Sequence, residues 1–75
     1  IFTDLKIYPI PASNHLINIK SNLEYSYEII NINGVRLLND SHKASSTNTI
    51  KLNSGIYFLK IYRKGSYFTK KIIIQ

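Results

Sequence analysis

The side chains that could support acid–base or metal chemistry are few and far apart in this 75-residue chain. Glu24 and Glu28 form the only close pair of carboxylates. General acid–base catalysis needs two such groups to converge in a cleft, but this spacing divides them between a loop and a strand face. His15 and His42 are 27 residues apart, without the short spacings that are typical of metal ligands. These residues therefore predict neither a carboxylate active site nor a metal site.

The remaining catalytic residue types also lack a recognisable setting. Serines are frequent around Ser41 and Ser45, but no nucleophile elbow frames them. The three glycines are scattered and form no phosphate-binding loop. The chain has no cysteine, so it has neither a disulfide framework nor a thiolate metal site. We expect a domain that is not an enzyme and has no cofactor.

The net charge of +6 is concentrated in the second half of the chain. Residues 1–40 hold all four acidic residues and three basic ones, whereas residues 41–75 hold seven basic residues and no acid. Such an asymmetry is typical of proteins with an anionic partner, such as nucleic acid, lipid headgroups or an acidic protein surface. The alternative is that the lysines form the solvent face and protect the edges of a small sheet.

Aromatic residues interleave with this basic charge, which is a feature of single-strand nucleic-acid binders. The residues concerned are Phe58, Tyr62, Tyr67 and Phe68 among Lys60, Arg63, Lys64 and Lys70. Against this interpretation, the aromatic residues alternate as a strand core would, and the chain lacks the glycine-aromatic strand signatures of cold-shock or RRM sheets. A small basic nucleic-acid-binding β-barrel is thus kept as an alternative.

Short apolar runs separated by turn residues predict an all-β domain. We expect seven strands, at residues 5–8, 15–20, 25–32, 35–38, 49–52, 56–63 and 67–74. Pro9 and Pro11 should end the first strand because proline cannot donate a ladder hydrogen bond. Asn33-Gly34 predicts a hairpin with a type I′ turn. The polar segment 39–48 is expected to be a loop or a crossover between sheets.

The stretch around Gly55 predicts a tyrosine corner, in which a tyrosine hydroxyl bonds to backbone a few residues upstream. Leu52 would enter the core, Gly55 would take a conformation that other residues resist, and Tyr57 would supply the hydroxyl. The alternative is a plain hairpin followed by a core tyrosine. Tyr57, Leu59 and Ile61 are expected on the core face of their strand.

Three segments, in this order, resemble the type A C-terminal sorting domain of the type IX (Por) secretion system of Gram-negative bacteria. They are Ile7-Tyr8-Pro9-Ile10-Pro11-Ala12, Ile32-Asn33-Gly34-Val35 and Leu52-Asn53-Ser54-Gly55-Ile56-Tyr57-Phe58-Leu59-Lys60-Ile61, followed by the basic-apolar ending Lys70-Lys71-Ile72-Ile73-Ile74. The chain departs from the family pattern at Ile10, which replaces a usual asparagine, and mildly at Asn33.

The resemblance implies an immunoglobulin-like antiparallel β-sandwich at residues 5–75, with residues 1–4 as the end of a linker. It implies a secretion signal for an attached cargo. The cargo would pass through the periplasm, cross the outer membrane and reach the cell surface or the medium. The implied partners are an outer-membrane translocon or shuttle protein and a sortase-like peptidase that removes the domain. The chain has no methionine and begins at Ile1, so we expect it to come from a longer protein.

The last strand is the expected recognition element. Lys70, Lys71, Ile72, Ile73 and Ile74 would supply charge steering and pocket anchors, and an exposed terminal strand would allow strand addition. The alternative is that Lys70 and Lys71 only protect the sheet edge from aggregation. Homodimer formation through this strand is a further alternative. An adhesion or carbohydrate-binding module of a secreted protein remains a second candidate function. No apolar run of membrane-spanning length is present, so no membrane insertion is expected.

Overall fold

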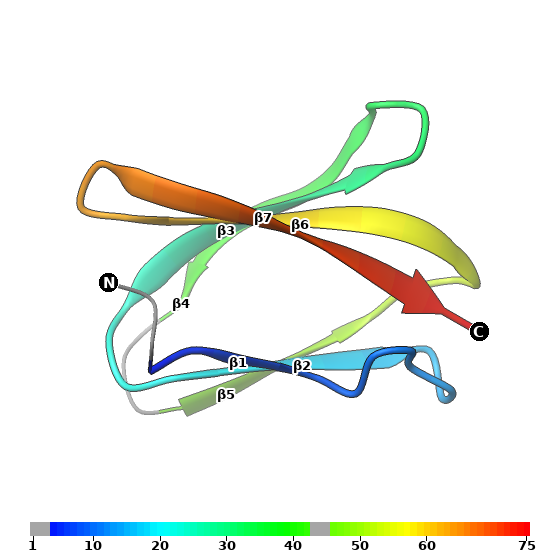
Figure 1. Ribbon diagram of the computed structural model, residues 1–75, viewed down its shortest axis with the longest axis horizontal. Helices are drawn as coiled ribbons and strands as arrows, with labels where there is room; N and C mark the ends of the chain where they lie inside the picture. Colours follow the sequence, from blue (N-terminus) through cyan, green and yellow to red (C-terminus); the bar gives the residue numbers. More distant parts are fainter. Residues whose placement is uncertain (1–3, 43–45) are drawn as a thin grey trace.

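The computed structural model describes residues 4–42 and 46–75, and this part of the chain forms seven β-strands. They are β1 (Lys6–Tyr8), β2 (Leu16–Ser21), β3 (Tyr25–Asn31), β4 (Arg36–His42), β5 (Ser46–Lys51), β6 (Gly55–Arg63) and β7 (Ser66–Ile74). The strands pair in antiparallel fashion in two sheets, with the orders β1-β2-β5 and β4-β3-β6-β7. Figure 1 shows the two sheets as separate layers. The predicted all-β sandwich is confirmed.

The core lies between the two sheets because apolar residues alternate along the central strands. The core face of β6 carries Tyr57, Leu59 and Ile61, as predicted, and that of β3 carries Tyr25, Tyr27 and Ile29. The other buried apolar residues are Ala12, Ile17, Ile19, Ile50, Leu52, Ile72 and Ile74. Burying one such large side chain contributes roughly 1.5–3 kcal/mol. Packing of this kind stabilises a chain that has no disulfide.

The turn between β3 and β4 is not the predicted type I′ turn. Of the two residues predicted at its centre, Asn33 and Gly34, only Gly34 has a positive φ, +83°. The Gly34 amide donates to the Asn31 carbonyl at 2.9 Å, and the Asn31 side-chain oxygen accepts from the amides of Asn33 (2.9 Å) and Val35 (3.0 Å). The Asn31 side chain thus stabilises a longer turn. The hairpin was correctly predicted, but the turn type was wrong.

A two-residue turn with positive φ at both positions joins β6 to β7 instead. Its central residues are Lys64, with a φ of +49°, and Gly65, with a φ of +81°. Arg63 and Ser66 pair directly across it. This backbone matches the twist of the flanking strands.

Strands β4 and β5 are longer than predicted. β4 reaches His42 and β5 begins at Ser46, so both extend into the segment predicted as a polar loop, of which residues 43–45 lie outside the described residues. The extension follows from pairing: Ser41 lies opposite Ser26, and Asp40 opposite Tyr27. A neighbouring strand can therefore recruit residues with low strand propensity. The predicted crossover between sheets is confirmed, because β4 and β5 belong to different sheets.

Candidate recognition surface

The loop between β5 and β6 contains the predicted tyrosine corner. The Tyr57 hydroxyl donates a 2.7 Å hydrogen bond to the carbonyl of Asn53, and Leu52 is buried in the core. Gly55 has a φ of +156°, a conformation that residues with a side chain rarely adopt. A methyl group built on Gly55 would lie 3.6 Å from the Tyr57 hydroxyl, which is an ordinary contact. Backbone conformation, not lack of space, therefore favours glycine here.

The proline segment leads from the end of β1 to the edge of β7. Tyr8, Pro9 and Pro11 are exposed, whereas the following residue, Ala12, is fully buried. The Ala12 amide donates to the Ile73 carbonyl at 2.9 Å, and the Ala12 carbonyl accepts from the Gln75 amide at 2.8 Å. The first segment that carries the family resemblance thus holds the last strand in place.

The five residues of the predicted recognition segment on β7 divide into two groups. Ile72 and Ile74 are buried in the core, whereas Lys70, Lys71 and Ile73 are exposed. A partner could therefore contact only the latter three side chains without unfolding the strand. Since β7 is the last strand of its sheet, one of its edges also lacks a neighbouring strand in the described part of the chain, apart from the bridge at Ala12.

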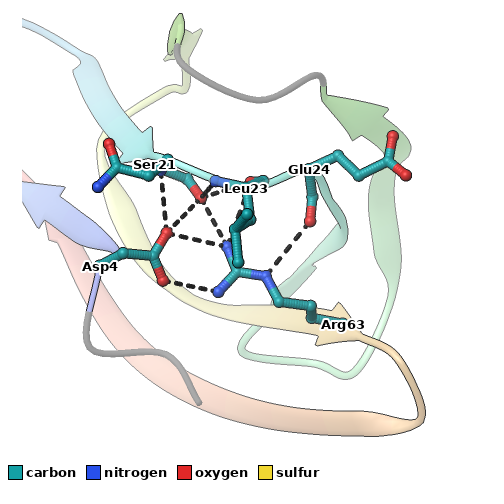
Figure 2. Close-up of polar contacts among 6 residues, drawn as sticks. Asp4, Ser21, Leu23, Glu24 and Arg63 are labelled. Atoms are coloured by element: carbon teal, nitrogen blue, oxygen red, sulfur yellow. Dashed lines mark hydrogen bonds and ion pairs between the residues drawn. The ribbon is translucent and has the colours of Figure 1, made fainter.

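A buried polar cluster that the sequence did not reveal ties the two sheets together (Figure 2). Arg63, at the end of β6, is only 5 % exposed. Its Nη1 donates to Asp4 Oδ1 at 2.7 Å and its Nη2 to Asp4 Oδ2 at 3.3 Å, so the contact is bidentate. The guanidinium also donates to Ser21 Oγ at 2.6 Å and to the carbonyls of Leu23 (3.2 Å) and Glu24 (3.3 Å).

Asp4 is held in its ionised form by this cluster. The hydrogen bond from Arg63 lowers the pKa of the Asp4 carboxyl well below its ordinary value, and the Asn22 amide and Ser21 hydroxyl act in the same direction. Hydrogen bonds to the charged form of a carboxyl favour that form. Sequence reasoning assigned Asp4 to the linker and Arg63 to the basic surface, because nothing in their spacing shows that they meet.

The outer face of the four-stranded sheet carries a second polar group. Glu28 forms an ion pair with Arg36 at 2.9 Å and accepts a 3.1 Å hydrogen bond from the Tyr62 hydroxyl. Lys60 lies over the Tyr67 ring, 4.6 Å from its centroid. The Glu28 carboxylate is thus bonded to Arg36 and Tyr62. Figure 2 shows the Glu24 side chain extending away from Arg63. The two carboxylates that were considered for catalysis do not form one site.

The two histidines do not meet either. The His15 carbonyl accepts from the Leu52 amide at 2.8 Å, and its ring Nδ1 lies 3.1 Å from the Leu52 carbonyl oxygen. His15 precedes β2, whereas His42 lies opposite Tyr25, which follows β2, so the histidines occupy opposite ends of the sandwich. Within the described residues, no three histidine, cysteine or acidic side chains gather as a metal site would require.

The aromatic and basic residues do not form a single surface for nucleic acid. Tyr62 and Tyr67 pair on the outer face of the sheet, whereas Phe68 pairs with the buried Ile61 on the inner face. Arg63 is buried against Asp4 and is therefore not available to a phosphate. Phe58, Tyr62 and Tyr67 share the outer face with Lys60. Phe68 and Lys70 lie on the inner face, so the predicted set as a whole does not form one stacking platform.

The comparisons with known proteins agree with the resemblance seen in the sequence. A family profile described as the secretion system C-terminal sorting domain matches residues 6–75, which include all seven strands. A comparison with individual curated proteins finds no match. No helix in the described residues is long and apolar enough to cross a membrane. Because the profile covers nearly the whole chain, the chain belongs to the family of C-terminal sorting domains of the type IX secretion system.

Proposed function

We propose that this chain is a folded sorting signal that directs an attached cargo protein through the outer membrane by the type IX system. The match of the sorting-domain profile to residues 6–75 is the observation that carries this proposal. A sorting signal of this system is recognised by the secretion machinery and leads to the cell surface or the extracellular space. The cargo would fold or wait in the periplasm, and an outer-membrane translocon or its shuttle protein would bind the domain there.

Strand β7 is the proposed recognition element. A machine that exports many different cargoes needs a rigid feature that all of them share. Ile72 and Ile74 anchor β7 in the core, and Ala12 fixes its end, so the exposed Lys70, Lys71 and Ile73 are presented in a defined geometry. Pre-organisation of this kind reduces the entropic cost of binding.

The proposed cleavage by a sortase-like peptidase would occur upstream of Asp4. Peptidases generally bind their substrates as extended segments, and Asp4 is already bonded to Arg63, Ser21 and Asn22 of the sandwich. The chain from Asp4 onward is thus engaged in the folded domain. Intact-mass measurement of an exported cargo would locate the cut, and a cut within β1 or later would contradict this placement.

The function is tested by fusing these 75 residues to the C-terminus of a periplasmic reporter, in cells with a type IX system. The proposal expects reporter outside the outer membrane in the parent strain and retention in a translocon-deficient strain. A matched fusion that carries Leu59→Asp, a charge placed in the core, should be retained in both strains. Retention of the folded wild-type fusion in the parent strain would overturn the proposal.

A further inference from the structure

An apolar groove lies on the side of the sandwich where β1 and β7 form the ends of their sheets. The groove has a volume of about 440 Å³ and is lined by Leu5, Ile7, Phe68 and Lys70. Leu5, Ile7 and Phe68 pack against the core but are only partly buried. Lys70 belongs to the same face of β7 as the buried Ile72 and Ile74, yet it is exposed. The inner face of β7 is thus incompletely covered at this position.

Contacts with the rest of the sandwich lie near both ends of β7. At one end, Ala12 bonds to the backbone of Ile73 and Gln75. At the other end, Asp4 bonds to Arg63. Between these two points, the described residues place no strand beside the outer edge of β7. The edge is therefore held rigidly at its ends and left free in its middle.

The backbone register shows which peptide groups this free edge presents. The Ile73 carbonyl points outward, because it accepts from Ala12. Peptide groups alternate in direction along a strand, so those of Tyr67, Thr69 and Lys71 also point outward. The two-residue turn that makes Arg63 and Ser66 a hydrogen-bonded pair leads to the same alternation. At about 3.4 Å per residue, this edge can pair with a short extended segment.

Charge around the edge selects the side chains of such a segment. Lys70 is exposed on one side of β7, Lys71 on the other, and Lys6 is exposed on β1. No acidic residue follows Asp40 in the chain, and Asp4 is neutralised by Arg63. Because opposite charges steer association and like charges oppose it, an acidic segment is favoured over a basic one.

We propose that the groove between β1 and β7 binds an extended acidic segment of a partner protein, which adds as a strand to β7 at Tyr67, Thr69 and Lys71. One apolar side chain of the segment packs against Leu5, Ile7 and Phe68, and its carboxylates contact Lys70 and Lys71. Backbone pairing of this kind tolerates sequence variation, while the pocket and the charges set the specificity. The identification of the partner as part of the secretion machinery rests on the proposed function, but the groove itself does not.

The binding step is tested on the isolated domain with a defined probe. The probe is a blocked nonapeptide of glutamate and threonine with a central valine, and amide shifts are followed by NMR. We expect shifts at Tyr67, Thr69 and Lys71, and no shifts with a peptide that has lysine in place of glutamate. Methylation of the peptide nitrogens on the bonding edge should abolish binding. Absence of shifts, or shifts that are indifferent to methylation, would overturn the proposal.

Two variants test whether the edge and its charge act together. Thr69→Pro removes an outward N–H without removing a ladder bond, and the double variant Lys70→Glu, Lys71→Glu reverses the charge. We expect each to weaken peptide binding about tenfold or more. The control for charge is the double variant Lys51→Glu, Lys64→Glu, at exposed sites that do not line the groove. Equal loss in the control would contradict the proposal.

The same variants in the reporter fusion separate this inference from the proposed function. If the wild-type fusion is exported and the folded β7 variants are retained, both proposals are supported. If the folded β7 variants are exported as efficiently as wild type, the groove is not the recognition site, although the sorting function stands. If the wild-type fusion is retained, the sorting function fails, and the peptide titration alone decides the groove. Sedimentation showing a dimer that Thr69→Pro abolishes would assign the edge to a second copy instead.

Discussion

The guanidinium of Arg63 donates two hydrogen bonds, of 2.7 and 3.3 Å, to the carboxylate of Asp4, which lies 59 residues earlier in the chain. This contact joins the segment before β1 to the end of β6, and therefore one sheet to the other. Ser21 completes the cluster from β2. A buried arginine is tolerated because its donors are matched by a carboxylate, a hydroxyl and backbone carbonyls.

Acid should selectively weaken this cluster. Because the pKa of Asp4 is lowered in the folded state, its contribution to stability is complete above the ordinary aspartate pKa of about 4 and is lost as the pH falls below it. The difference in unfolding free energy between wild type and Asp4→Asn should thus be largest near neutral pH and shrink in acid. Urea titrations at several pH values measure it, with Glu24→Gln as the control. A difference that does not change with pH would contradict the assignment.

Tyr57→Phe should cost about 1 kcal/mol, since it removes one hydrogen bond and leaves the ring in the core. The Tyr57 hydroxyl is bonded to the Asn53 carbonyl, which fixes the loop before β6. Tyr67→Phe is the matched control, because Tyr67 is 59 % exposed at the other end of the hairpin. Chemical denaturation compares the two. Equal effects would mean that the corner bond contributes nothing particular to the fold.

Neighbouring isoleucines on β7 should differ in their contribution to stability. Ile72 is fully buried, so Ile72→Ala should destabilise the domain by about 2–5 kcal/mol. Ile73 is 38 % exposed on the opposite face, and Ile73→Ala should cost less than about 1 kcal/mol. Thermal unfolding followed by circular dichroism measures both. A larger loss for Ile73 than for Ile72 would contradict the assigned strand register.

Lys64→Asn should stabilise the β6–β7 hairpin by a few tenths of a kcal/mol, on the order of 0.5. Lys64 has a φ of +49°, which a lysine adopts at a cost and an asparagine tolerates better. Lys51→Asn, at an exposed strand position, controls for the loss of charge. Denaturant midpoints of the two variants provide the comparison. If Lys64→Asn destabilises the domain and Lys51→Asn does not, the Lys64 side chain contributes to stability and the prediction is wrong.

Much of the fold could be predicted because the signals are local. Alternation marked the inner face of β6, and Leu52, Gly55 and Tyr57 marked the corner. The turn at Asn33 was misjudged because Asn31, two residues earlier, supplies the hydrogen bonds that decide the turn type. The ends of β4 and β5 were missed because they depend on pairing partners and not on their own composition.

The candidate site was harder to predict because it is built from contacts that are distant in sequence. Lys70 to Ile74 could be singled out from their composition, but only the fold shows that Ile72 and Ile74 are buried and that Ala12 closes one end of the edge. The cluster of Asp4, Ser21 and Arg63 left no pattern in the sequence.

The fraction of reporter found outside the outer membrane is the most direct test of the central claim, that the folded domain is itself the export signal. It is measured by protease accessibility on intact cells and by assay of the medium, with the 75-residue fusion in parent and translocon-deficient strains. We expect external reporter in the parent strain alone. Equal amounts of folded fusion inside both strains would contradict it.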